Sequence, residues 1–103
     1  QCAIDKFFGG DAALFDAFAL TCHQQFVLDM QQADAAEARA DLADLRRLVH
    51  SLKAVLLTMG HTVVSALAAR TEMAAADALP EAWPLWHGLR SALQRLIEDK
   101  RPG

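Results

Sequence analysis

Apolar residues recur along this chain every three or four positions, the spacing that places side chains on one face of an α-helix. The clearest run lies in residues 41–60, where Asp41 is a candidate N-cap at one end and Gly60 a helix breaker at the other. Its core-facing positions are Leu42, Leu45, Val49, Leu52, Leu56 and Met59. The pattern predicts a helix of about five turns with a single apolar face.

A longer apolar run precedes this helix, in residues 14–40. It has two interpretations: one long helix that bends, or two helices with a kink near Gln25. The absence of proline and glycine favours the single helix. Its apolar positions are Leu14, Phe15, Phe18, Cys22, Phe26, Val27, Met30 and Ala33.

Two further runs follow Gly60. The third reads Val63, Val64, Leu67, Ala68, Thr71 and Ala75, and the fourth reads Trp86, Leu89, Leu93, Leu96 and Ile97. Pro80 is expected to start the last helix, with Pro84 in its first turn, where a missing N–H costs little. Trp83 and Trp86 are assigned to the core.

Residues 1–10 form a predicted short, partly helical lead-in, which Gly9-Gly10 ends before Asp11 caps the next helix. Four amphipathic helices joined by short loops predict an all-α, antiparallel up-down four-helix bundle with this lead-in helix at its N-terminus. Residues 1–103 are expected to be a single domain.

Composition supports helices and narrows the function. The chain has 21 alanines and only 11 β-branched residues, a balance that favours helix over strand. The net charge of −3 argues against nucleic-acid binding. Two cysteines, no apolar run of about 20 residues and no signal peptide indicate a cytoplasmic domain with reduced thiols and no direct membrane contact. Because the chain begins with Gln, we expect it to be cut from a larger protein, whose other parts could anchor it in the inner membrane.

One histidine lies off the core stripe. His50 follows Val49, so it lies about 100° round the helix and is expected to be exposed. The face that it shares carries residues spaced by three and four positions: Arg46, His50, Lys53 and Leu57. On spacing alone, the commoner interpretation is an ordinary surface histidine.

The predicted turn at Gly60 and His61 gives His50 a candidate partner. His50 lies ten residues before Gly60 and Glu72 lies eleven after His61, so both are about 15 Å from the turn. A glutamate there can accept the Nδ1 proton and leave Nε2 free as a nucleophile. Lys53, one turn from His50, would supply positive charge for a phosphoryl group. The alternative is that Lys53 and Glu72 are simply solvated charges.

These residues resemble the signature of histidine-containing phosphotransfer (HPt) domains, the relay modules of two-component phosphorelays. That signature is His-x-Leu-Lys-Gly, then a Gly ten residues after the His, an apolar position and a Glu. Here the corresponding residues are His50-Ser51-Leu52-Lys53-Ala54, Gly60, Val64 and Glu72. Gly9-Gly10-Asp11 with Leu14 and Phe18 resembles the opening helix of the family, and Asp41 stands where its phosphoaccepting helix commonly starts.

The resemblance implies that His50 accepts a phosphoryl group from a receiver-domain aspartate and passes it to another receiver. Lys53 and Glu72 would complete the catalytic residues, and the docking surface for the partner would include Arg46, Ala54, Leu57 and Gly60. Mg²⁺ would lie in the receiver, so no cofactor or metal is expected in this chain. It would be a monomeric phosphocarrier without kinase activity of its own, within a bacterial hybrid sensor histidine kinase.

Two departures from the signature leave a second function open. The Gly four residues after the His is Ala54 here, which is still small, and Leu57 replaces a small residue. Leu57 would either crowd the phosphoryl group or provide an apolar docking contact, and we favour docking. The alternative function is an HPt-like module that docks receivers or dimerises without being phosphorylated. A weaker one is a helical structural fragment in which His50 and Glu72 do not interact.

The remaining histidines have ordinary interpretations. His61 is expected to be a loop or cap residue and His87 to be exposed. Adjacent residues on a helix face different directions, so Cys22 and His23 are not expected to share a zinc ion.

Overall fold

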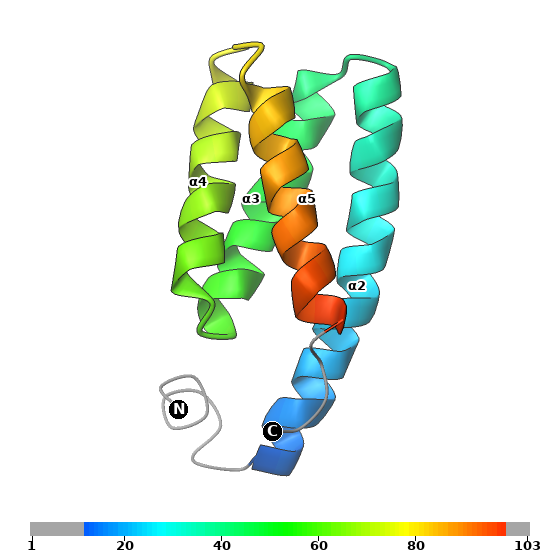
Figure 1. The fold of residues 1–103 in the computed structure, drawn as a ribbon, viewed down its shortest axis with the longest axis vertical. Helices are drawn as coiled ribbons and strands as arrows, with labels where there is room; N and C mark the ends of the chain where they lie inside the picture. Colours follow the sequence, from blue (N-terminus) through cyan, green and yellow to red (C-terminus); the bar gives the residue numbers. More distant parts are fainter. Residues whose placement is uncertain (1–11, 99–103) are drawn as a thin grey trace.

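A computed structural model describes residues 12–98, and these residues form four helices and no strand. The helices are α2 (Ala12–Ala38), α3 (Leu42–Thr58), α4 (Thr62–Ala76) and α5 (Ala82–Glu98). They run alternately up and down beside one another (Figure 1), which confirms the predicted all-α four-helix bundle. The predicted lead-in of residues 1–10 and the cap at Asp11 lie outside the described residues.

The first run of apolar residues forms one continuous helix, as favoured. The part of α2 that packs in the bundle buries Cys22, Phe26, Met30, Ala33 and Ala36. Its N-terminal end extends past the other three helices in Figure 1, and Leu14 there is exposed. The assignment of Val27 to the apolar stripe is wrong. Val27 is exposed because it lies about 100° round the helix from the buried Phe26.

The helix α3 begins and ends where the sequence predicts. The Asp41 side chain accepts a hydrogen bond from the backbone N–H of Asp44 at 3.0 Å, which caps the first turn. Gly60 has φ 87°, a conformation that glycine adopts without steric cost, and it reverses the chain after the helix. The buried side chains of α3 form a single stripe, Leu45, Leu48, Val49, Leu52 and Leu56.

The core face of α4 differs from the predicted stripe. Val63 was assigned to the core but is exposed, whereas Ser65 is buried. Small side chains make up this face, namely Ser65, Ala68, Thr71, Ala74 and Ala75. The Ser65 hydroxyl donates to the backbone carbonyl of Lys53 at 3.0 Å, so a polar contact joins α4 to α3. A rule that looks for large apolar side chains cannot find such a face.

The last helix carries most of the aromatic core. Trp86 is fully buried and Trp83 packs half-buried against the core, as predicted. Pro84 lies in the first turn, but α5 begins at Ala82, so Pro80 belongs to the preceding turn rather than to the helix. This corrects the prediction that Pro80 starts the last helix.

A salt bridge and a histidine–carboxylate hydrogen bond join α5 to α2 on the outside of the bundle. Arg90 Nη2 lies 2.8 Å from Asp34 Oδ2, and His87 Nε2 lies 2.7 Å from Glu37 Oε2. His87 is exposed, as expected, but its pairing with a carboxylate was not foreseen.

Candidate functional site

The hairpin of α3 and α4 brings His50 and Glu72 into contact. His50 Nδ1 lies 2.7 Å from Glu72 Oε2, although the two residues are 22 positions apart. The His50 side chain is 66% exposed, whereas that of Glu72 is 15% exposed. The contact that was predicted from the turn at Gly60 is therefore present, with the imidazole toward solvent and the carboxylate toward the bundle.

The carboxylate can hold one tautomer of the imidazole. An ionised carboxylate only accepts hydrogen bonds, so the proton of the neutral ring stays on Nδ1 and the lone pair stays on Nε2. The Lys53 ammonium lowers the pKa of Glu72, and the hydrogen bond from His50 lowers it further, against an opposing effect of burial. Glu72 is therefore ionised at neutral pH.

Two parts of Lys53 contact α4. Its Nζ lies 2.6 Å from Glu72 Oε1, and its backbone carbonyl accepts the hydrogen bond from Ser65. The two oxygens of Glu72 therefore bind different partners, one His50 and the other Lys53. In this arrangement the Lys53 ammonium neutralises the carboxylate, and its predicted role toward a phosphoryl group stays a prediction.

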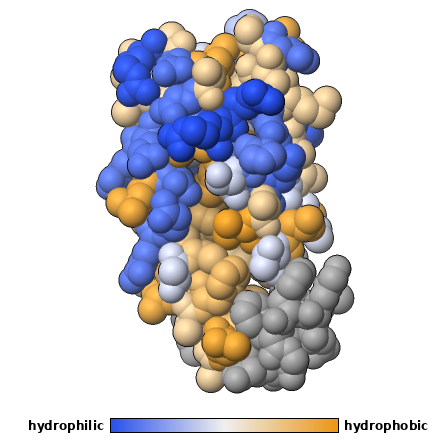
Figure 2. Space-filling view, turned by 180° about the vertical axis from the view of Figure 1, so that it is seen from behind, coloured by the Kyte–Doolittle hydropathy of each residue, from blue (hydrophilic) through white to orange (hydrophobic). Residues whose placement is uncertain are grey.

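A hollow of about 360 Å³ opens beside His50. It is lined by Ala43, Arg46, Arg47, His50, Ser51 and Glu72. Figure 2 shows the side of the bundle behind α5, where hydrophilic residues cover most of the upper half and hydrophobic residues gather below. The lining of the hollow thus combines the exposed His50 imidazole with the side chains of Arg46 and Arg47.

Comparison with known protein families shows which family the chain belongs to. The model of the Hpt domain family matches residues 14–99, a span that contains His50, Lys53 and Glu72. The chain belongs to the Hpt domain family. Neither the curated proteins nor the solved structures give a significant match to it. Hpt domains carry out phosphotransfer in two-component signalling and interact there with receiver domains.

The residues predicted to dock a partner are distributed along α3 of this Hpt domain. Arg46 and Ala54 are exposed on either side of His50, and Leu57 is 58% exposed. Gly60 lies beyond the end of the helix and has a backbone role in the turn. Contact of any of the four with a partner stays a prediction.

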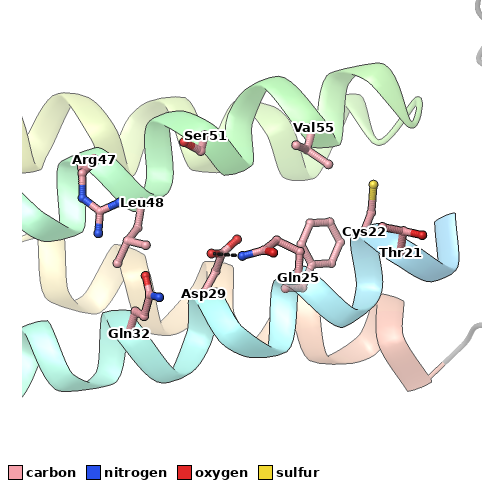
Figure 3. A pocket seen from close by; sticks show the side chains of 10 residues that line it. Thr21, Cys22, Gln25, Asp29, Gln32, Arg47, Leu48, Ser51 and Val55 are labelled. Carbon is pink, nitrogen blue, oxygen red and sulfur yellow. Dashed lines mark hydrogen bonds between the residues drawn. The ribbon is translucent and has the colours of Figure 1, made fainter. Parts of the chain in front are cut away.

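A second hollow, of about 530 Å³, lies between α2 and α3 of the Hpt domain (Figure 3). Arg47 and Ser51 line both hollows. Here Asp29 is only 9% exposed and accepts a hydrogen bond from Gln25 at 3.0 Å. Burial raises the pKa of the Asp29 carboxyl above its usual range, and the bond from Gln25 offsets this only in part. The hydrophobic pattern does not single out Asp29. Its burial could have been predicted only from its position next to Met30, within the core-facing stripe of the helix.

Replacing Asp29 with asparagine is expected to stabilise the Hpt domain at neutral pH by about 1 kcal/mol, because it removes a buried charge and keeps a polar group for Gln25. A raised pKa means that the folded state binds the proton more tightly than the unfolded chain. The contribution of Asp29 to stability is therefore full below the usual aspartate pKa and is lost as pH rises through the raised pKa. Urea unfolding should show the difference between variant and wild type shrinking in acid.

The control is Asp16→Asn, which changes an exposed aspartate on the same helix and should leave the free energy of unfolding nearly unchanged. Equal effects of the two substitutions, or a gain from Asp29→Asn that persists in acid, would show that burial of the carboxylate is not the cause.

Other candidate groups do not join the site. His61 is the N-cap residue of α4, as predicted, and burial lowers its pKa. Cys22 is a free, buried thiol whose pKa burial raises, which makes it a poor nucleophile. Within residues 12–98 no group of three or more His, Cys, Asp or Glu side chains is arranged to hold a metal ion. None of the described helices has the length and apolar character needed to cross a membrane.

Proposed function

We propose that His50 Nε2 accepts a phosphoryl group from an aspartyl phosphate of a receiver domain and passes it to an aspartate of another receiver. The contact of 2.7 Å between His50 Nδ1 and the Glu72 carboxylate carries this proposal. This contact leaves the Nε2 lone pair directed away from Glu72. The His50 side chain is also exposed enough for a partner to reach.

The chemistry follows from the charges of the site. The Nε2 lone pair forms a bond to phosphorus while the bond from phosphorus to the aspartyl oxygen breaks, and the aspartate leaves as a carboxylate. The ring keeps its Nδ1 proton and becomes positively charged, and the ionised Glu72 stabilises that charge. Transfer to the second receiver is the same step in reverse, which regenerates the neutral imidazole. Mg²⁺ for this chemistry would lie in the receiver.

We place the domain in the cytoplasm, as a phosphocarrier without kinase activity of its own within a bacterial hybrid sensor histidine kinase. Mixing it with phosphorylated receiver domains of the source organism, one at a time, tests the proposal. The expected result is a phosphate on the Hpt domain that is labile in acid and stable in base. A receiver that binds without ever transferring phosphate would favour the docking module instead.

Leu57 is assigned to docking because of its distance from the nucleophile. It lies seven residues after His50, which is about 10 Å along the helix axis. Side chains on a helix lean toward its N-terminus, so the His50 ring leans away from Leu57. An exposed leucine beside the nucleophile, but out of reach of its phosphoryl group, suits an apolar contact with the receiver.

Truncation of Leu57 to alanine should weaken receiver binding by roughly fivefold to tenfold, the effect of losing a contact worth about 1 kcal/mol. The measurement is a titration of the receiver followed by calorimetry or fluorescence. Leu28→Ala is the matched control, because Leu28 is similarly exposed but lies on the outer side of α2. Unchanged affinity together with faster transfer in Leu57→Ala would instead mean that Leu57 crowds the phosphoryl group.

A further inference from the structure

The phosphoryl group proposed for His50 needs a cation, and the structure distinguishes between the candidates. A phosphoryl group carries between one and two negative charges at neutral pH. Three basic side chains of α3 lie within about one turn of His50, namely Arg46, Arg47 and Lys53. Which of them binds the group is a question that rests on the proposed function and goes beyond it.

Lys53 is already occupied. Its ammonium lies 2.6 Å from Glu72 Oε1 and its backbone carbonyl is tied to Ser65, so α4 holds both ends of the residue. Lys53 is also not among the residues that line the hollow beside His50. Moving its ammonium to a phosphoryl group would leave Glu72 with only one partner.

Arg47 is occupied as well. Its guanidinium makes two hydrogen bonds to Asp44 Oδ1, at 2.7 and 3.0 Å. Asp44 accepts a further bond from Arg39, and its pKa is lowered, first of all by the bond from Arg47. The charge of Arg47 is therefore largely balanced within the first turns of α3.

Arg46 remains. Among residues 12–98 it is the basic residue of the hollow that makes no ion pair or side-chain hydrogen bond, and its side chain is exposed. It lies four residues before His50, on the same face of α3. Because a helical side chain covers the turn that precedes it, the His50 ring leans toward the turn of Arg46 and away from that of Lys53.

We infer that Arg46 binds the phosphoryl group on His50, while Lys53 positions and neutralises Glu72. A guanidinium offers several N–H donors in a fixed plane, which suits the oxygens of a phosphoryl group. The hydroxyl of Ser51, also in the hollow, provides a further donor.

Phosphoramidate is the probe, since it phosphorylates histidine without a receiver. The Nε2 lone pair forms a bond to phosphorus, the P–N bond of the reagent breaks, and its nitrogen leaves as ammonia. The Nδ1 proton stays on the ring, whose positive charge Glu72 balances. The variants are Arg46→Gln, Arg46→Lys, Lys53→Gln and the control Arg70→Gln, which changes an exposed arginine of α4 away from the hollow.

Arg46→Gln is expected to slow labelling of His50 about tenfold, the effect of one charge-assisted hydrogen bond. Arg46→Lys should restore part of the rate, and Arg70→Gln should match the wild type. A second measurement separates binding from folding: the ³¹P shift of the phosphohistidine followed against pH. A neighbouring cation lowers the pKa of the phosphoryl group, so Arg46→Gln should raise that pKa. Lys53→Gln should raise it less, because the Lys53 ammonium is already paired with Glu72.

The outcomes separate this inference from the proposed function. The inference would be overturned if Arg46→Gln were labelled at the wild-type rate and its ³¹P titration gave the wild-type pKa. It would also be overturned if only Lys53→Gln changed that pKa. In both cases the phosphorylation of His50 would still stand. A wild-type domain that is not labelled at His50 would overturn both. Circular dichroism of each variant checks that the helices are retained.

Discussion

Replacing His50 with glutamine is expected to reduce phosphorylation of this Hpt domain to background. Glutamine can still hydrogen-bond to Glu72, but its amide has no lone pair basic enough to attack phosphorus. The loss should therefore be complete while the bundle stays folded, because the His50 side chain is exposed and fills no part of the core. Phosphate transferred from a phosphorylated receiver and stable in base is the quantity to measure.

The chain provides a matched control for this substitution. His87 is also exposed and also pairs with a carboxylate, but through the other ring nitrogen: its Nε2 lies 2.7 Å from Glu37 Oε2. His87→Gln should be phosphorylated like the wild type. If the label survives in His50→Gln and disappears in His87→Gln, the nucleophile is His87 and the assignment to His50 is wrong.

Glu72→Gln is expected to slow phosphorylation of His50 by about a hundredfold or more, as when a carboxylate that orients a catalytic histidine is replaced by an amide. The amide can donate its N–H₂ to Nδ1, which would move the ring proton to Nε2 and remove the lone pair. It also lacks the negative charge that stabilises the phosphorylated ring. Initial rates with phosphoramidate measure the effect without a contribution from docking.

Glu37→Gln is the control for Glu72→Gln, because it removes the carboxylate that pairs with His87. Its labelling rate should not change. A small effect of Glu72→Gln, within about threefold of wild type, would mean that the carboxylate does not set the tautomer of His50.

The pKa of Glu72 also predicts how the stability of the hairpin depends on pH. Its folded-state pKa is lowered, chiefly by Lys53, so the stabilisation is full above the usual glutamate pKa and is lost as pH falls through the lowered pKa. The loss of stability that protonation of Glu72 causes at low pH should therefore be absent in Glu72→Gln.

Periodicity and the turn at Gly60 were sufficient to predict the arrangement of the helices and the pairing of His50 with Glu72. Both depend on helix geometry, which residue spacing reports directly: Asp41 and Gly60 set the limits of α3, and counting from the turn brought Glu72 level with His50. Membership of the Hpt family agrees with the signature around His50.

The contacts of individual side chains could not be predicted from residue spacing. The long side chain of Lys53 can reach in several directions, so its spacing from His50 does not reveal that it binds Glu72. The burial of Asp29 and Ser65 depends on how closely neighbouring helices pack, and small or polar residues at these positions give no apolar signal. Val27 and Val63 are apolar yet exposed, because side-chain chemistry alone does not specify which face a helix buries.

The most direct test of the account is to locate the phosphorus atom on the domain after transfer from a phosphorylated receiver. With ¹⁵N-labelled protein, ³¹P and ¹⁵N NMR identify both the residue and the ring nitrogen that carries the phosphoryl group. We expect phosphorus on Nε2 of His50, with the proton retained on Nδ1 beside Glu72. A phosphoryl group on Nδ1 of His50 or on any other residue would contradict it.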